Sequence, residues 1–137
     1  MNQYATQAVF IADDDEDDRY LLQIAFREYC PACQLRFATD GLNLLDALTQ
    51  TDIHPCLIIL DMNMPRLNGL ESLSVLRSNP LYQKTPIIIL TTSSAAGDRQ
   101  RAHELGANDF ITKPLSLNLF GPIIHKLRET WHLDGCI

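Results

Sequence analysis

The feature that most constrains the fold is an unbroken apolar run, Cys56–Leu60, which stops at Asp61. An uninterrupted run of this kind, rich in β-branched residues, is typical of a strand that is buried on both faces of a sheet. Asn63 and Pro65 follow and indicate a turn. An aspartate at the tip of a central strand is either a turn former or a reactive carboxylate, and residues elsewhere in the chain distinguish the two.

Strand and helix patterns alternate five times, which predicts an α/β fold: a doubly wound, five-stranded parallel sheet flanked by five helices. The predicted strands are Ala8–Ala12, Gln34–Ala38 at an edge of the sheet, Cys56–Leu60, Pro86–Leu90 and Asp109–Thr112. Four of the predicted helices carry stripes of mostly apolar residues: Leu21, Ile24, Ala25 and Glu28; Leu44, Leu45, Ala47 and Leu48; Leu70, Leu73, Val75 and Leu76; and Phe120, Ile123, Ile124, Leu127 and Trp131.

The helix ends are also marked. Asp15 is the expected N-cap of the first helix, with acidic residues in the first turn where the helix dipole favours them. The fourth helix, Ala96–Leu105, has a thin stripe, mostly of alanine, and should end at Gly106. Pro122 requires that the last helix either begins near Phe120 or kinks.

Length and charge set further bounds. The 137 residues suffice for one domain with a hydrophobic core, and we expect one domain over residues 1–137 with no output domain. No apolar run approaches the ~18 residues of a membrane span, and the polar start is not a signal peptide, so we expect a cytoplasmic protein without a membrane partner. The net charge of -6 comes from the run Asp13–Asp18, because acidic and basic residues are otherwise equal in number. That distribution argues against a nucleic-acid partner and favours a local cation site.

The four cysteines and four histidines do not have the spacing of a metal site. Cys30-Pro31-Ala32-Cys33 has redox-motif spacing, but it follows a predicted helix, whereas a thioredoxin-type motif follows a strand. We therefore predict that Cys30 and Cys33 are two reduced thiols in a loop. We also predict that the histidines, His54, His103, His125 and His132, lie at the surface.

Polar residues stand at the carboxyl ends of four predicted strands, the edge where such sheets bind ligands. They are Asp13 and Asp14, Asp61, Thr91 and Thr92, and Lys113. Carboxylates within ~4–6 Å raise each other's pKa, and a hard cation such as Mg²⁺ relieves the repulsion. A cation, an ammonium group and a hydroxyl around a nucleophilic oxygen can receive a phosphoryl group.

From about Val9 to Leu127 the chain resembles the receiver domains of two-component response regulators, which have a flavodoxin-like sheet of order 2-1-3-4-5. The resemblance rests on four motifs in the right order: Asp13-Asp14, Asp61 with Pro65 and Gly69, Thr91, and Lys113-Pro114.

The resemblance implies that Asp61 is the phosphoacceptor and a metal ligand. It implies that Asp14 binds Mg²⁺ directly, that Asp13 does so mainly through water, and that Asn63 offers its backbone carbonyl. Lys113 would contact both the phosphate and Asp61.

The resemblance also implies a switch. Thr91 would bond a phosphoryl oxygen and shift, the rotamer of Phe110 would follow, and the Lys113–Pro114 peptide bond would be cis. Plainer roles stay open, because Thr91 can cap a helix and Phe110 can be simple core.

Three departures from the common receiver pattern are specific to this chain. Ser93, with Asn63, should affect water access to the acyl phosphate. Gly121-Pro122 disturbs a face that many members use for partners. Trp131 and Thr92-Ser93-Ser94 resemble the small stand-alone regulators that serve phytochrome-type sensor kinases.

The leading hypothesis is a signalling phosphoprotein and not an enzyme. It takes a phosphoryl group on Asp61 from a sensor histidine kinase or a histidine phosphotransfer protein, acts on an unidentified downstream protein, and is a monomer or weak homodimer. One alternative is a haloacid-dehalogenase-like phosphatase, which needs a second carboxylate where this chain has Asn63. The other is a phosphorylation-independent interaction module, which should lack one of the key residues.

Overall fold

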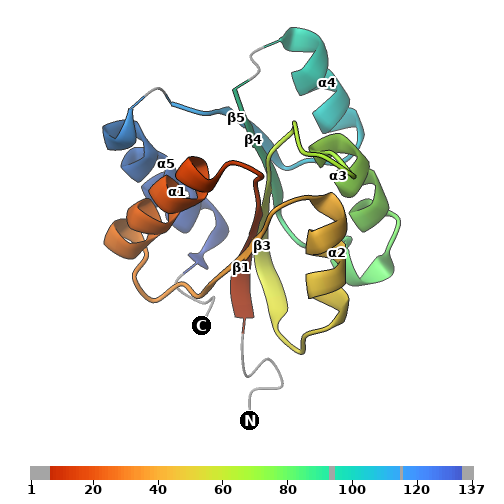
Figure 1. The fold of residues 1–137 in the computed structure, drawn as a ribbon, viewed down its shortest axis with the longest axis horizontal. Coiled ribbons are helices and arrows are strands. Elements are labelled where there is room, and N and C mark those ends of the chain that lie inside the picture. The colour runs from red at the N-terminus through yellow and green to blue at the C-terminus, as the bar shows by residue number, and fades with distance from the viewer. Residues whose placement is uncertain (1–6, 93–94, 115, 134–137) are drawn as a thin grey trace.

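The structure is a computed structural model that describes residues 7–92, 95–114 and 116–133. Strands and helices alternate along these residues (Figure 1). The strands are β1 (Gln7–Ala12), β2 (Leu35–Ala38), β3 (His54–Leu60), β4 (Ile87–Thr91) and β5 (Asp109–Thr112). The α-helices are α1 (Glu16–Tyr29), α2 (Gly41–Thr49), α3 (Gly69–Arg77), α4 (Ala96–Glu104) and α5 (Phe120–Trp131), and the 3₁₀ helices are η1 (Pro80–Tyr82) and η2 (Leu117–Leu119). Ser93, Ser94 and Cys136 fall outside the described ranges.

The five strands form one parallel sheet in the order β2-β1-β3-β4-β5, which confirms the predicted fold class and places β2 at an edge. In Figure 1, α1 and α5 cover one face of the sheet, and α2, α3 and α4 cover the other. The chain therefore reverses its direction of winding between β1 and β3, so that the carboxyl ends of these two strands lie side by side. Ala12 pairs with Leu60 at that end.

The central strands are almost entirely apolar because both of their faces are buried. Val9 and Ile11 of β1 pack with the core on the α1 and α5 side, whereas Phe10 and Ala12 pack with the core on the opposite side. The same alternation divides β3, where Leu57 and Ile59 face α1 and α5. Such two-sided burial removes the polar positions that a half-exposed strand would have.

The predicted N-cap of α1 is confirmed, and its predicted apolar face is correct at Ala25 but wrong at Glu28. The Asp15 side chain accepts hydrogen bonds from the backbone N–H groups of Asp17 and Asp18. The helix buries Leu22, Ala25 and Phe26, whereas Glu28 is exposed. Adjacent apolar residues such as Leu21 and Leu22 fit two alternative helix faces equally well. Packing against α5 selects the face that buries Leu22.

The last helix begins at Phe120, as one of the two alternatives predicted, and Pro122 lies in its first turn, where proline does not break the backbone ladder. Gly121 lies against Tyr29 of α1. A Cβ atom at position 121 would overlap the Tyr29 ring. Close contact of α5 with α1 therefore requires glycine at this position.

Helix α4 is weakly anchored, as predicted, because Ala102 is its one buried residue. Its end is well defined: Gly106 has a φ of 102° and donates to the His103 carbonyl, while Ala107 donates to the Ala102 carbonyl. This is a Schellman motif, which favours glycine at the left-handed position.

Arg77 joins α3 to the neighbouring turns. Its guanidinium donates to the carbonyls of Gly106, Tyr82 and Thr85 at 2.6–2.9 Å and to the Asn108 side chain at 2.7 Å. One half-buried side chain thus connects α3, η1 and the turn before β5.

The prediction of reduced thiols at Cys30 and Cys33 is wrong, because the structure joins them in a disulfide with a Cα–Cα distance of 5.5 Å. The end of α1 and the turn that follows bring the two Cα atoms within the range that a disulfide spans. Among the histidines, His103, His125 and His132 are exposed as predicted, and His54 is half-buried in β3.

Candidate functional site

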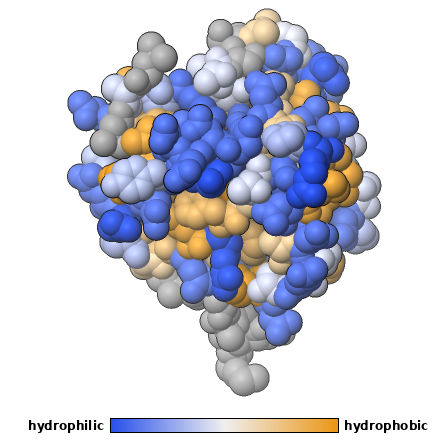
Figure 2. All heavy atoms as spheres, viewed as in Figure 1, coloured by the Kyte–Doolittle hydropathy of each residue, from blue (hydrophilic) through white to orange (hydrophobic). Residues whose placement is uncertain are grey.

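Backbone hydrogen bonds between strands bring the predicted polar residues to one edge of the sheet. The Asp61 N–H donates to the carbonyl of Ala12, the residue before Asp13, at 2.9 Å. The Lys113 N–H donates to the Thr91 carbonyl at 2.7 Å. Figure 2 shows hydrophilic residues gathered around the start of α1, the helix that follows Asp13-Asp14 in Figure 1.

Asp13 is the most enclosed of the carboxylates, at 1% exposure. Its Oδ1 accepts a hydrogen bond from the Asp15 N–H at 2.9 Å, and its Oδ2 lies 2.9 Å from Lys113 Nζ. Its carbonyl accepts a bond from the Arg19 guanidinium at 2.8 Å. Burial raises the pKa of Asp13, although the hydrogen bonds to its carboxylate oppose the rise.

Lys113 connects three carboxylates. Its Nζ lies 2.7 Å from Asp18 Oδ2, 2.9 Å from Asp13 Oδ2 and 3.4 Å from Asp61 Oδ2, and its side chain is 6% exposed. Burial alone would lower the pKa of Lys113, but the carboxylates raise it above its ordinary value. The ammonium therefore stays charged at neutral pH.

Asp61 is 6% exposed, and its electrostatic setting differs from that of a surface aspartate. Burial, and then repulsion by Asp13, raises its pKa to about 6, while Lys113 and a backbone hydrogen bond from Asn63 oppose the rise. The carboxylate is thus ionised at neutral pH but at a considerable electrostatic cost, which a nearby cation would remove.

Three carboxylates are close enough to share that cation. Oxygen atoms of Asp13, Asp14 and Asp61 all lie within 4.8 Å of one another, and Asp14 is exposed to solvent. Hard oxygen ligands of which one faces solvent suit Mg²⁺ or Mn²⁺, which retain water in their coordination shells. Asn63 is exposed in the loop that follows Asp61.

A close approach at Gly69 and an ion pair of Arg66 fix the loop after Asp61. A Cβ atom at position 69 would overlap the Asp61 carbonyl oxygen, so Gly69 lets α3 begin against the site. Arg66, in the left-handed region at φ 66°, forms a two-point ion pair with Asp40, the N-cap of α2, at 2.8 and 3.1 Å. The ion pair lowers the pKa of Asp40.

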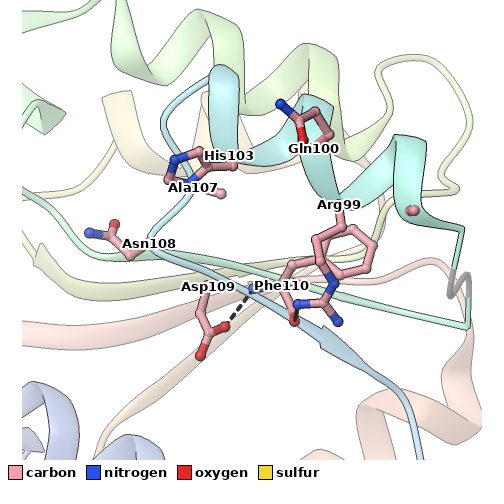
Figure 3. A pocket seen from close by; sticks show the side chains of 8 residues that line it. Arg99, Gln100, His103, Ala107, Asn108, Asp109 and Phe110 are labelled. Carbon is pink, nitrogen blue, oxygen red and sulfur yellow. Dashed lines mark hydrogen bonds between the residues drawn. The ribbon is translucent and has the colours of Figure 1, made fainter.

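Thr91 and Phe110 lie on neighbouring strands behind the site. Thr91 is fully buried at the end of β4, and Phe110 is buried on β5. Figure 3 shows Arg99 of α4 reaching over the Phe110 ring, with its guanidinium carbon 4.9 Å from the ring centre. The Arg99 guanidinium also donates to the Phe110 carbonyl at 3.1 Å. A pocket of about 450 Å³ opens beside them, between α4 and β5.

One predicted detail is wrong. No peptide bond between described residues is cis, so the Lys113–Pro114 bond is trans. The trans form of a bond before proline is favoured by about 0.5–1 kcal/mol in the absence of other constraints.

The contact of Asp18 with Lys113 was not predicted from the sequence. The helix dipole alone accounts for an acidic residue at this position, yet its carboxylate makes the shortest of the three contacts of Lys113. No local pattern points to this contact, because Lys113 lies 95 residues further along the chain. The Asp40–Arg66 ion pair likewise could not be predicted from the sequence spacing of the two residues.

A 2-1-3-4-5 parallel sheet with this acidic pair, central aspartate, buried hydroxyl and lysine defines the receiver class of signalling domains. The comparisons with known proteins agree. The model of the response regulator receiver domain matches residues 9–124, and the chain belongs to that family.

Relatives are similar in both sequence and structure. The probable chemotaxis protein CheY of Rhizobium etli is 38% identical over 117 residues, which cover 80% of this chain and 82% of that protein. The phosphorylated cyanobacterial phytochrome response regulator RcpA has a TM-score of 0.86 at 28% identity, covering 93% of this chain and 95% of that chain. The Mn²⁺-bound form of response regulator Rcp1, a Synechocystis protein, has a TM-score of 0.81 at 27% identity, covering 91% and 94%.

The family is one of two-component signalling, in which receiver domains interact with histidine kinases or phosphotransfer proteins. Within the described part of the chain, no helix has both the length and the apolar character to cross a membrane.

Proposed function

We propose that this chain is a response regulator that accepts a phosphoryl group on Asp61 from the phosphohistidine of a sensor histidine kinase or a histidine phosphotransfer protein. One observation carries the proposal: the buried ammonium of Lys113 contacts Asp61 and Asp13, whose oxygens lie within 4.8 Å of a solvent-facing Asp14 oxygen. This is a charged, partly enclosed acceptor with one open side.

The cation that we propose for the site is Mg²⁺, held by Asp13, Asp14, Asp61 and the backbone carbonyl of Asn63. The residues fit it, because the donors are hard oxygens and the raised pKa values of Asp13 and Asp61 record unrelieved burial and repulsion. When bound, Mg²⁺ neutralises charge on the transferring phosphoryl group. A divalent ion is also found in a relative, since response regulator Rcp1 has a Mn²⁺-bound form.

The transfer needs Asp61 in its ionised form. A carboxylate oxygen of Asp61 attacks phosphorus, the bond from phosphorus to the partner's imidazole nitrogen breaks, and its electron pair stays with the imidazole. Lys113 remains charged throughout, and its contact with Asp61 places it to bond a phosphoryl oxygen. No proton needs to leave the acceptor, so the chain requires no general base.

Phosphorylation would then move Thr91 and Phe110. The new group adds up to about two negative charges at the site. A shift from 1:99 to 99:1 between two states needs about 5.5 kcal/mol, which a few charge-assisted bonds of about 1.5–3 kcal/mol each can supply. In the present state, Arg99 lies over the buried Phe110 ring, next to the pocket between α4 and β5. Release of the ring would reshape this pocket for a downstream protein.

The two rival functions fit less well. A phosphatase of the haloacid-dehalogenase type needs a carboxylate two residues after the nucleophile, where this chain has Asn63. An interaction module that ignores phosphorylation has no need of five intact site residues: Asp13, Asp14, Asp61, Thr91 and Lys113. We further propose a single receiver domain, a monomer or weak homodimer in the cytoplasm, with a protein and not a nucleic acid as its target.

The test is phosphoryl transfer from a phosphorylated histidine kinase or from phosphoramidate in the presence of Mg²⁺, followed by intact-protein mass spectrometry. We expect one added phosphoryl group on the wild type and on Asp52→Asn, a control at an exposed loop carboxylate. We expect none on Asp61→Asn. Equal labelling of Asp61→Asn, or no labelling of the wild type by either donor, would overturn the proposal.

A further inference from the structure

The contact between Asp18 and Lys113 is not required by the fold. Asp15 already caps α1, and Glu16 and Asp17 already supply acidic groups to its first turn. The Asp17 side chain is exposed, whereas that of Asp18 is 24% exposed and lies against the ammonium. Asp18 therefore adds a fourth carboxylate to a site in which Asp13, Asp14 and Asp61 already suffice for the metal.

The fourth carboxylate changes what Lys113 can offer to an incoming anion. An ammonium group has three N–H donors, and here three carboxylate oxygens lie within 3.4 Å of it. The Asp18 oxygen is the nearest, at 2.7 Å, and the Asp61 oxygen is the farthest, at 3.4 Å. The ammonium is thus drawn toward α1, and its charge is largely compensated before any phosphoryl group arrives.

We propose that Asp18 is a specificity residue that disfavours small anionic phosphoryl donors relative to a docked protein donor. The inference rests on the proposed phosphoacceptor role of Asp61. A small donor has only its own charge with which to bind the site, so it meets the full repulsion of Asp18 and the weakened attraction of Lys113. A protein donor binds through its surface, so contacts remote from phosphorus offset the same repulsion.

The removal of Asp18 should leave the ammonium in place, because Asp13 still holds it at 2.9 Å. An Asp18→Asn variant keeps the size and the N-terminal helical position of the side chain but removes one negative charge next to Lys113. The matched control is Asp17→Asn, which removes the same charge one residue away, in the same helical turn, from an exposed side chain. Any effect of net charge or of the helix dipole appears in both variants.

The experiment measures the rate of Asp61 phosphorylation with Mg²⁺ against the concentration of two small donors, acetyl phosphate and phosphoramidate. Acetyl phosphate is a dianion at neutral pH, and phosphoramidate carries one negative charge fewer. We expect Asp18→Asn to lower the half-saturating concentration of acetyl phosphate by about threefold to tenfold, with a smaller decrease for phosphoramidate. The maximal rate should change little, and added salt should reduce the difference.

Several outcomes separate the inference from the proposed function. If Asp18→Asn equals Asp17→Asn with both donors, or if it slows the maximal rate, then Asp18 does not act against small donors and the inference is overturned. Equal effects on the two donors at all salt concentrations would point to a structural role and overturn it as well. If neither the wild type nor Asp18→Asn is labelled by a small donor or by a phosphorylated kinase, the proposed function itself fails.

Discussion

The replacement of Asp61 by asparagine should stabilise the metal-free protein. Burial and repulsion by Asp13 raise the pKa of Asp61 from 3.8 to about 6. A shift of this size corresponds to about 3 kcal/mol of folding free energy lost when the group is ionised. The attraction of Lys113 is already included in that pKa, and an amide resembles the neutral carboxyl, so we expect Asp61→Asn to gain about 2–3 kcal/mol at pH 7.5 in EDTA.

The gain should depend on pH in a defined direction. Because the folded-state pKa of Asp61 lies above its unfolded value, the unfolded chain releases this proton first, and the stability of the wild type falls as pH rises from about 4 to about 6. Below about pH 3 the carboxyl is protonated in both states and the penalty vanishes. At pH 4.5 about two thirds of the advantage of Asp61→Asn should be gone.

Bound Mg²⁺ should reduce the stability advantage of Asp61→Asn over the wild type. At a Mg²⁺ concentration of about a hundred times its Kd, the wild type gains about 2.7 kcal/mol, and Asp61→Asn gains less because it has lost a ligand. Urea denaturation followed by circular dichroism measures each value, with Asp52→Asn as the exposed control. The electrostatic reasoning would be refuted if Asp61→Asn were no more stable than the wild type in EDTA at pH 7.5. It would also be refuted if the gain in stability did not change with pH or with Mg²⁺.

Two further predictions concern the scaffold. Gly121→Ala should lower the free energy of unfolding in urea by about 1–3 kcal/mol, because the added Cβ meets the Tyr29 ring. Gly97→Ala in α4, which has open space around it, should be neutral or stabilising, and equal effects of the two substitutions would contradict the contact. Arg77→Ala should cost about 3 kcal/mol, because several partly buried acceptors lose a charged donor. The exposed Arg101→Ala should change stability by less than about 0.5 kcal/mol. A loss of under about 1 kcal/mol at Arg77 would refute its bridging role.

Much of the architecture was predictable because the strands are buried on both faces. The unbroken run before Asp61 and the run before Thr91 need helices on both sides of the sheet, and that requirement also locates the carboxyl edge. Residues far apart in the chain, such as Asp13 and Lys113, could be assigned to one site on this basis alone.

The errors arose where local patterns are nearly degenerate. Leu21 and Leu22 fit two rotations of α1, and contact with α5 selects between them. Spacing alone does not fix a Cα–Cα distance, so the disulfide of Cys30 and Cys33 could not be predicted. The isomer of a bond before proline depends on a small free-energy difference that the surroundings readily reverse.

Asp18 shows a different limit. Its acidic side chain has an adequate explanation in the helix dipole, so nothing in the sequence requires a second one. The contact with Lys113 appears only when the loop after β5 lies near the start of α1, a long-range arrangement that no local pattern encodes.

The central claim is that Asp61 itself carries the phosphoryl group. The most direct measurement is borohydride reduction of the protein after phosphorylation with Mg²⁺, which converts an aspartyl phosphate to homoserine, followed by peptide mass spectrometry. We predict homoserine at position 61 and at no other aspartate, and its absence when Mg²⁺ is removed by EDTA. Homoserine at Asp13 or Asp14, or a phosphoryl group on a histidine or serine with position 61 unmodified, would contradict the claim.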